Sequence, residues 1–536
     1  MHAMAQNKNY VLFLTFIATL GGLLFGYDTA VISGTTGALQ EFFINPLYAD
    51  TQLSFVAISE FKIIATICFA TVVIIFTGLF YKLFNGNLIK TALVASIFIV
   101  LIGYIDYQEY LKQSTTLNEG LANSIKGFII SSALFGCIIG GGIAGAVGQL
   151  LGRKKGLILS AILFTISALG SAIPELINFT GGTVIASFVF YRIIGGIGVG
   201  IASMLSPTYI AEIAPSNIRG KLISWNQFSI IFGMLVVYFV NYFIAKDQDP
   251  TWVNNIGWRW MFASELIPAS LFFSLLFLVP ESPRYLMMKG DETGALSVLN
   301  KLTDSTTANA TIQEIKASFS AKTAPWLTFG SSIIIIGILI SVFQQFVGIN
   351  VVLYYAPEIF KTLGSNSDTS LLQTIIVGAI NLLFTVLAIQ TVDKFGRVKL
   401  QFIGAVVMAI SMFVLGTAFY FENKSILPLL AMLAYVAGFA MSWGPVAWVL
   451  LAEIFPNSIK GALSLAVAAQ WFANYLVSWT FPMMNESTQL TETFHHGFAY
   501  WIYGLMSVLA AIFIIKFVPE TKGKSLEEME QLWKKK

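Results

Sequence analysis

The stretch AEIAPSNIRG (Ala211–Gly220) returns as AEIFPNSIKG (Ala452–Gly461), so one ten-residue motif occurs twice in the chain. Two further motifs also occur twice: LGRKK (Leu151–Lys155) with FGRVK (Phe395–Lys399), and VPESP (Val279–Pro283) with VPET (Val518–Thr521). The matching charged residues are separated by 453 − 212 = 241, 397 − 153 = 244 and 520 − 281 = 239 positions. Because three motifs share one offset and keep their order, the repetition predicts two related halves arranged as a parallel pseudo-repeat.

The composition of the 536-residue chain is that of a membrane protein. Hydrophobic residues make up 56% and charged residues only 11%, with a mean hydropathy of +0.76. Soluble domains carry about 25% charged residues. Apolar runs of the length that crosses a bilayer, about 20 residues, recur along the chain, and lipid leaves a spanning backbone few options besides the helix. We therefore expect an all-α membrane protein and not an enzyme.

Fourteen apolar runs are expected to span the membrane. They cover residues 10–34, 63–81, 89–105, 127–150, 156–174, 184–211, 222–244, 258–279, 327–355, 371–392, 399–420, 426–452, 462–484 and 498–518. The repetition accounts for six spans per half, and the two runs within about 63–105 remain as an accessory hairpin. The expected units are a first half at 1–280, a linker with short helices at 281–326, a second half at 327–518 and a tail at 519–536.

Basic residues cluster in short loops that fall on one side of the predicted spans. Such residues resist translocation and mark the cytoplasmic side. The clusters are Arg153–Lys155, Arg219 with Lys221, Lys394–Lys399, Lys460 and Lys534–Lys536. We therefore expect both termini, the linker and the tail to be cytoplasmic. A net charge of +3 spread among such loops does not indicate a nucleic-acid partner.

Few side chains could bind a metal. Cys68 and Cys137 both lie in apolar runs, where a thiol behaves as a small hydrophobe, so neither a disulfide framework nor a zinc site is indicated. His495 and His496 are interpreted as residues of a solvated loop. We expect no metal and no cofactor.

Asp28 interrupts the first apolar run, within GGLLFGYDTAVISG (Gly21–Gly34). A charged carboxylate in the middle of a membrane span costs at least about 2.5–3.5 kcal/mol, so something must compensate it. Either backbone or water near the outer end of the span satisfies this residue, or it takes up a proton opposite a basic partner. Arg192 is an intramembrane cation that could balance it, and Glu265 is a second acid within a span.

Amide side chains in the second half suit a sugar. Sugar recognition needs hydrogen-bond donors and acceptors for the hydroxyls and aromatic faces for the ring. Gln344 and Gln345 point about 100° apart on a helix and could edge one cavity, and Asn350 follows just past Gly348. A single membrane glutamine or asparagine can also serve only to join two helices.

Nine motifs in order resemble the sugar porter branch of the major facilitator superfamily, and within it the bacterial D-xylose/proton symporters. They are GGLLFGYDTAVISG, YRIIGGIGVG, SPTYIAEIAP, IRGKL, PESPRYL, FQQFVGINVVLYYAP, TVDKFGR, SWGPVAWVLLAEIFP and VPETKG. The resemblance covers nearly the whole chain apart from the accessory hairpin. It implies the major facilitator fold, with two six-helix halves around a central sugar cavity and the hairpin beside them.

The resemblance also implies roles for particular residues. Asp28 matches the family's proton site and Arg192 its partner. We also expect Glu265, the second acid within a span, to take part in proton coupling. The positions matching the family's sugar site are Phe25, Gln227, Gln344, Gln345, Asn350, Tyr354, Asn381, Trp448, Gln470 and Trp471. A cytoplasmic gate is expected from Arg153, Glu212, Arg219, Arg397, Glu453 and Lys460, with ion pairs between the halves that form when the carrier faces outward and break when it faces inward.

Two departures from the family pattern affect this gate. The residues before Arg153 read Gln149, Leu150, Leu151 and Gly152, without the family's usual Asp or Asn followed by Arg. Lys460 stands where the family has arginine, and lysine cannot make the planar two-pronged contact with a carboxylate. We expect a looser clamp than usual.

The expected function is import of D-xylose with a proton by alternating access, because pure facilitators of the family carry a neutral residue at the position of Asp28. A facilitative uniporter for hexose or pentose and a non-transporting membrane sugar sensor remain as alternatives. D-glucose is a further possible ligand, since the same amides and aromatics serve both rings. We expect a monomer in the lipid bilayer of a bacterial cytoplasmic (inner) membrane.

Overall fold

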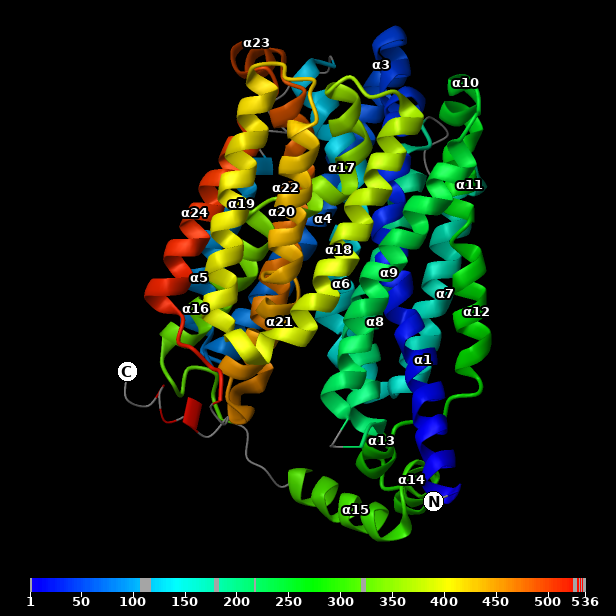
Figure 1. Cartoon of the computed structure of the whole chain (residues 1–536), viewed down its shortest axis with the longest axis vertical. Coiled ribbons are helices and arrows are strands. Elements are labelled where there is room, and N and C mark those ends of the chain that lie inside the picture. The colour runs from blue at the N-terminus through cyan, green and yellow to red at the C-terminus, as the bar shows by residue number, and fades with distance from the viewer. Residues whose placement is uncertain are drawn as a thin grey trace.

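Helices build the molecule, and most of them run along its long axis (Figure 1). This computed structural model describes residues 2–106, 117–177, 183–215, 218–319, 324–523, 528–529, 531 and 533, and no strand occurs within them. In Figure 1, α1 starts and α24 ends at the lower end of the molecule, whereas α3 and α23 lie at the upper end. We refer to these as the lower end and the upper end.

The first half is built on six long stretches of helix, one of them divided in two. These are α1 (His2–Ala30), α6 (Glu119–Leu150), α7 (Arg153–Ala172), α8 (Ile185–Ile213), α9 (Arg219–Ala245) and the pair α11 (Trp258–Ala263) and α12 (Leu266–Leu276). Short elements join them: η1 (Val31–Gly34), α2 (Thr36–Leu39), η2 (Gln40–Ile44), α3 (Asn45–Ala49), η4 (Pro174–Leu176), α10 (Pro250–Trp252) and η5 (Val253–Gly257).

The second half repeats this plan, with two of its stretches divided. It contains α16 (Ser331–Phe346) with α17 (Ile349–Thr362), α18 (Ser367–Phe395), α19 (Arg397–Tyr420), α20 (Leu427–Met441) with α21 (Pro445–Ile454), η6 (Asn457–Ala462), α22 (Leu463–Asn485), α23 (Thr488–Phe494) and α24 (Phe498–Phe517). The linker forms α13 (Pro283–Met288), α14 (Glu292–Leu302) and α15 (Ser305–Phe319). The accessory hairpin consists of α4 (Thr51–Leu83) and α5 (Leu88–Asp106).

Each of the fourteen predicted runs coincides with a helix or a divided helix. By length and composition, eleven stretches in the described part of the chain could cross a membrane, so the protein is a multi-pass membrane protein. The three others are α5, whose apolar part is short (Leu88–Val100), the divided pair α11 and α12, and α22. α22 carries polar side chains such as Gln470 and Asn474, which lower its hydropathy.

The accessory hairpin starts earlier than the apolar run predicts. α4 begins at Thr51 and not near residue 63, because Asp50 caps its first turn. The Asp50 carboxylate accepts hydrogen bonds from the main-chain N–H groups of Gln52 and Leu53, at 2.8 and 3.0 Å. Such a cap satisfies donors that would otherwise lack partners, so polar residues can occupy the first turns of the helix.

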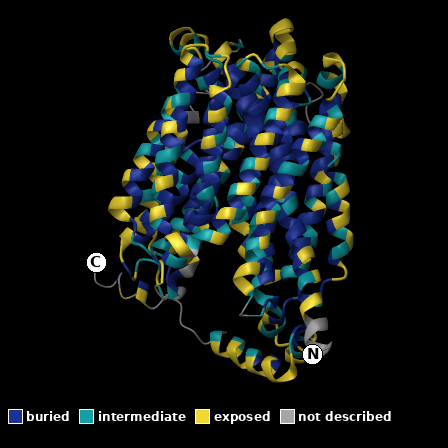
Figure 2. Cartoon of the chain, in the orientation of Figure 1, coloured by how far each residue is buried: buried dark blue, intermediate teal, exposed yellow. Residues whose placement is uncertain are grey.

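The two halves meet along two pairs of long helices, α6 with α22 and α9 with α18. At the upper end, α17 adds contacts with η1, α2 and α1. Buried residues fill the middle of the bundle, and exposed residues are common on its outside and on α15 (Figure 2). Of the helices that carry polar residues of the candidate site, α1, α9, α17, α18 and α22 contact the other half.

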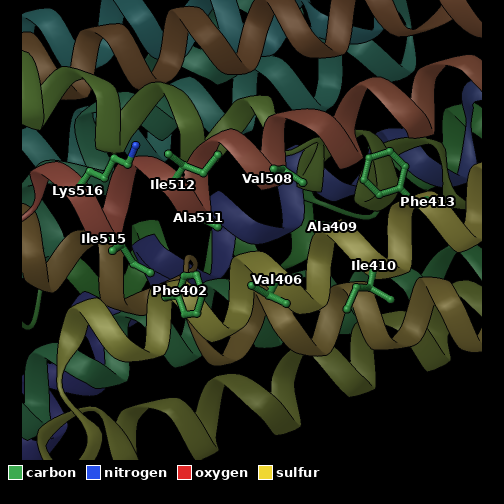
Figure 3. A pocket seen from close by; sticks show the side chains of 10 residues that line it. All are labelled: Phe402, Val406, Ala409, Ile410, Phe413, Val508, Ala511, Ile512, Ile515 and Lys516. Carbon is green, nitrogen blue, oxygen red and sulfur yellow. The ribbon is translucent and has the colours of Figure 1, made fainter.

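An apolar groove of about 460 Å³ lies on the outside of the second half, between α19 and α24. Figure 3 shows its lining side chains, which include Phe402, Ile410, Phe413 and Ile512, with Lys516 at one end. This groove lacks the amides and hydroxyls that a sugar needs. It is therefore a feature of the apolar outer surface and not the sugar site.

Candidate proton and sugar site

Asp28 and Arg192 form a buried ion pair between α1 and α8. Arg192 donates from Nη1 to Asp28 Oδ1 at 2.7 Å and from Nη2 to the Asp28 main-chain oxygen at 3.0 Å. The two side chains are 0% and 1% exposed, and the guanidinium also lies 5.2 Å from the centre of the Phe262 ring. Each charge is thus compensated by the other, which a membrane interior requires. Asp28 Oδ2 has no hydrogen-bond partner among the described residues.

Glu265 joins this pair as a second buried acid. It is 0% exposed and stands at the break between α11 and α12. The charges of Asp28 and Arg192 both act on it. Two acids and one cation therefore share one buried cluster, which brings together all three residues predicted for proton coupling.

A chain of amides links α16 to the breaks in two divided helices. Gln344 Nε2 donates to the main-chain oxygens of Trp443 and Gly444, at 2.8 and 3.2 Å. Gln345 Nε2 donates to Gln344 Oε1 at 3.5 Å, and Asn350 Nδ2 donates to Gln345 Oε1 at 2.5 Å. The predicted group Gln344, Gln345 and Asn350 is therefore continuous, and it is anchored where α20 gives way to α21.

Other predicted sugar residues lie on α1, α17 and α22. The Phe25 ring of α1 packs on the Trp471 ring of α22 with centroids 5.6 Å apart, which joins the two halves. Tyr354 of α17 is buried, lies beside Asn474 and Thr29 and feels the charge of Asp28. Gln470 is also buried, and its Oε1 has no partner among the described residues. Polar groups that could hold a sugar thus lie close to the candidate proton site.

Three predicted sugar residues are not joined to this group by the described hydrogen bonds and ring contacts. Asn381 is buried on α18, Gln227 is partly buried on α9, and Trp448 of α21 is 37% exposed. Their roles stay predictions. Sequence reasoning did not single out Asn474, nor the Tyr27 hydroxyl, which lies 2.8 Å from the Ser264 hydroxyl next to Glu265. Asn474 is four residues after Gln470 on α22, a helical spacing that could have found it.

The repeated motifs come together in two matching clusters at the lower end. In the first half, Arg153 Nη2 donates to Glu212 Oε1 at 2.7 Å, and the Glu281 carboxylate accepts the main-chain N–H groups of Arg153 and Lys154. Gly152, immediately before α7, has a φ of +91°, a conformation that favours glycine. The LGRKK motif therefore supplies a turn, a helix start and an ion pair at once.

The second half builds the same cluster from the second copies of the motifs. Arg397 donates from Nε and Nη2 to the two carboxyl oxygens of Glu453, at 3.1 and 2.7 Å. The Glu520 carboxylate accepts the main-chain N–H groups of Arg397 and Val398, at 3.0 and 3.1 Å, and Gly396 has a φ of +89°. Glu281 and Glu520 belong to these clusters but were not predicted as site residues, although both lie in the repeated VPES and VPET motifs.

Both of these ion pairs join residues of one half, whereas we expected gate pairs between the halves. Arg219 is exposed and donates to the Ala214 main-chain oxygen at 3.3 Å, also within the first half. The side chain of Lys460 lies outside the described residues. A link between the halves at this end stays a prediction for another conformation.

Glu281 and Glu520 accept hydrogen bonds from the first main-chain N–H groups of α7 and α19. Removing either carboxylate is expected to lower the stability of its half by a similar amount. A charged side chain that caps a helix start is worth about 1–2 kcal/mol, so Glu281→Gln and Glu520→Gln should each lower the thermal midpoint of the purified protein by a few degrees. Glu314→Gln, on the linker helix α15, is the control. Unfolding followed by fluorescence measures the shift, and a midpoint equal to that of the control would contradict the role of these caps.

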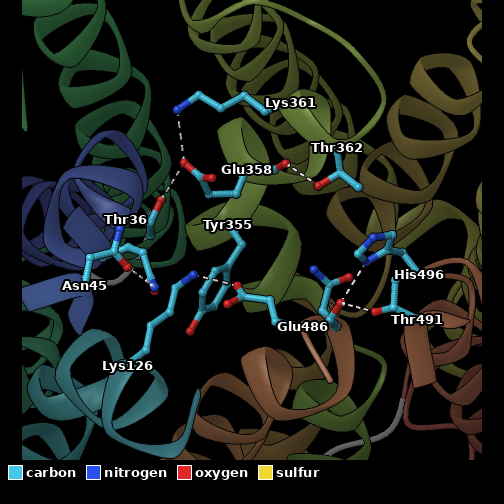
Figure 4. Close-up of polar contacts among 12 residues, drawn as sticks. Thr36, Asn45, Lys126, Tyr355, Glu358, Lys361, Thr362, Glu486, Thr491 and His496 are labelled. Carbon is cyan, nitrogen blue, oxygen red and sulfur yellow. Dashed lines mark hydrogen bonds and ion pairs between the residues drawn. The ribbon is translucent and has the colours of Figure 1, made fainter. Parts of the chain in front are cut away.

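Contacts between the halves gather at the upper end instead (Figure 4). Lys126 Nζ of α6 lies 2.6 Å from Glu486 Oε1 at the end of α22, and the two side chains are 8% and 30% exposed. The Glu119 carboxylate of α6 accepts from Thr488 N and Oγ1 of α23. Thr36 of α2 donates to Glu358 Oε1 of α17 at 3.4 Å. The upper end is therefore closed by polar contacts that cross from one half to the other.

Replacing Lys126 is expected to loosen this closure. Lys126→Gln leaves Glu486 without its ion-pair partner, and about 1 kcal/mol corresponds to about a fivefold change in a two-state equilibrium. A cysteine at Thr36, which is buried, should then react about fivefold faster with a hydrophilic maleimide. Lys424→Gln, an exposed lysine near the same end, is the control. An unchanged labelling rate in Lys126→Gln would show that the pair does not hold the end closed.

Comparison with known proteins identifies the family of this chain. The family model "Sugar (and other) transporter" matches residues 14–533. The chain therefore belongs to this family of membrane transporters and is not an enzyme.

Among curated relatives, the "D-xylose-proton symporter" of Escherichia coli (strain K12) is 54% identical over 542 residues, which cover 98% of this chain and 96% of the relative. The "Glucose facilitated diffusion protein" of Zymomonas mobilis is 43% identical over 423 residues, which cover 78% of this chain and 89% of the relative.

Solved structures show the same fold. A "partially occluded inward open conformation" of the E. coli xylose transporter XylE superposes with a TM-score of 0.77 at 51% identity and covers 96% of this chain and 100% of its own. XylE bound to 6-bromo-6-deoxy-D-glucose, described as a major facilitator superfamily protein, gives a TM-score of 0.73 at 52% identity and covers 98% and 100%. This chain therefore has the major facilitator fold that the sequence predicts.

Proposed function

We propose that the protein imports D-xylose together with a proton by alternating access. The observation that carries this proposal is the buried ion pair of Asp28 and Arg192, in a chain that also carries sugar-type amides and is related over its full length to a D-xylose-proton symporter. A uniporter needs no buried acid, and an acid is costly to retain within a membrane span.

Proton uptake by Asp28 would act through Arg192. While Asp28 is ionised, the 2.7 Å contact holds α1 against α8. A proton on the carboxylate cancels its charge and releases the guanidinium, which changes the relative free energies of the outward-facing and inward-facing states. A sugar that binds the two states differently biases the same equilibrium, and this shared bias couples the two solutes.

Glu265 and the amide chain complete the proposed machinery. Glu265 offers a second carboxyl group within reach of the same cation, so it would relay the proton or hold it when Asp28 is ionised. Gln344, Gln345, Asn350 and Gln470 would bind the sugar hydroxyls, and the paired rings of Phe25 and Trp471 would cover an apolar face of the ring.

The conformation described here would be the inward-facing one, with the lower end in the cytoplasm. Polar contacts between the halves gather at the upper end, whereas the lower ion pairs stay within each half. The basic loops predicted to be cytoplasmic, at Arg153 and Arg397, lie at the lower end together with the start of α1 and the end of α24. We also propose a monomer in the cytoplasmic membrane of a bacterium.

Purified protein in liposomes tests the function directly. With a pH gradient, acid outside, we expect labelled D-xylose to accumulate, and without the gradient we expect counterflow only. A panel containing D-xylose, D-glucose and L-arabinose at equal concentration determines the substrate. Sugar flux that is indifferent to the gradient would identify a uniporter, and sugar binding without any flux would identify a sensor.

A further inference from the structure

The accessory hairpin touches both halves, although the chain connects it only to the first half. Its upper part rests on that half. The Phe61 ring of α4 packs edge-on against the Phe128 ring of α6 with centroids 5.3 Å apart. Glu60, which is buried, accepts hydrogen bonds from the main-chain N–H and the hydroxyl of Thr183, just before α8.

Further along, the hairpin packs on the second half through a column of aromatic rings. Phe69 lies 6.0 Å from Trp479 of α22, and Phe76 lies 5.8 Å from Phe472 of the same helix. Phe98 of α5 also reaches Phe472, at 6.2 Å, and stands 5.0 Å from Phe76. Rings from both helices of the hairpin therefore converge on one face of α22.

The helices beneath the hairpin form one of the two seams between the halves. α6 and α22 cross so closely that a Cβ on Gly127 would lie 2.1 Å from the Trp479 main-chain oxygen. Trp479 Nε1 donates to the Ser124 main-chain oxygen at 3.2 Å across the same crossing. A Cβ on Gly142 of α6 would lie 3.7 Å from Ile75 Cγ2 of α4. The hairpin thus covers the seam and contacts a helix on each side of it.

We propose that the hairpin is a clamp across the α6 and α22 seam that stabilises the conformation closed at the upper end. Alternating access requires α6 and α22 to move relative to one another, and a hairpin attached to α6 and α8 cannot follow α22 as well. Its rings on α22 must therefore separate or slide when the lower end closes. Phe69 and Phe76 are buried by this contact, whereas Ile74 on the same helix is 71% exposed.

This inference rests on the alternating-access function proposed above, but its test needs neither xylose nor a proton gradient. Lys155 and Lys399 are exposed at the starts of α7 and α19. With both replaced by spin-labelled cysteine, pulsed electron paramagnetic resonance measures the distance between the lower ends of the two halves. Cys68 and Cys137 are buried, so they can stay unlabelled in the background. A failure of sugar or proton transport would therefore leave this measurement interpretable.

Phe76→Ala and Phe472→Ala remove the same contact from opposite sides. Each should increase the ratio of short to long label distances about fivefold, the change expected when one aromatic pair is lost. The double variant should shift the ratio by less than the sum of the two single effects, since both single variants remove the Phe76–Phe472 contact. Phe98→Ala, which touches the same cluster, should act in the same direction and serves if Phe76→Ala does not fold.

Ile74→Ala and Leu93→Ala, which truncate exposed residues of α4 and α5, are the matched controls and should leave the distances unchanged. Distances in Phe76→Ala and Phe472→Ala equal to those in the controls would overturn the proposal. So would a shift toward longer distances, because the hairpin would then favour closure of the lower end.

Discussion

Replacing Asp28 with asparagine is expected to abolish accumulation of D-xylose while leaving exchange of sugar across the membrane intact. Asparagine has nearly the shape of aspartate and resembles its protonated form, so the carrier can still alternate. It cannot gain or lose a proton, and the gradient then has no group through which to act. With the native protein, one pH unit, worth about 1.4 kcal/mol, can support about a tenfold concentration ratio, and in the variant the ratio should fall to one.

The measurement is uptake of labelled xylose into liposomes at a fixed pH gradient, followed by counterflow with the same preparation. Asp368→Asn, which alters an exposed acid at the start of α18, is the control for handling and folding. Counterflow by Asp28→Asn at a rate similar to that of the native protein shows that the variant is folded and can still exchange sugar. If Asp28→Asn concentrated xylose as well as the native protein does, the proton would enter elsewhere.

Replacing Gln344 with alanine is expected to weaken xylose binding by about 10- to 100-fold. The Gln344 amide is held by the Trp443 and Gly444 carbonyls, so it presents its remaining hydrogen-bonding atoms in a fixed direction. Its loss removes a partner for a sugar hydroxyl, which costs about 1–3 kcal/mol of binding free energy. Gln345 and Asn350 would also lose their support.

Isothermal titration of the purified variant with xylose measures this loss. Gln401→Ala is a matched control, because Gln401 is a fully buried amide of the same half that lies outside the site and whose side-chain atoms have no partner among the described residues. Equal affinity losses in both variants would indicate a general effect on the second half and would exclude a direct role of Gln344.

Sequence alone predicted the fold because each repeated motif forms the same local structure in both halves. Gly152 and Gly396 make the same turn, and Arg153 and Arg397 form the same ion pair with the acid of the AEI motif. The partners Glu281 and Glu520 were not predicted, since they bind main-chain N–H groups at helix starts, and no side-chain pattern marks those groups. The pairing within halves was missed because spacing gives residue types but not which half supplies the partner.

For the site, the sequence predicted residue types better than contacts. Asp28, Arg192 and Glu265 stood out because charge is rare in apolar runs, but only the packing of α1, α8 and the α11–α12 break brings them together. The position of the hairpin was beyond prediction for a related reason. A phenylalanine that faces lipid and one that faces another helix are equally apolar, so Phe76 and Ile74 look alike until the seam is known.

The pairing of Asp28 with Arg192 has a consequence for the energy source of uptake. Together the two groups carry no net charge, so a proton bound there, as proposed, would leave the loaded carrier one elementary charge more positive than the empty one. Membrane voltage, negative inside, would then drive the cycle with about 2.3 kcal/mol per 100 mV, in addition to any difference in acidity. A cell in neutral medium could thus go on collecting pentose on electrical potential alone.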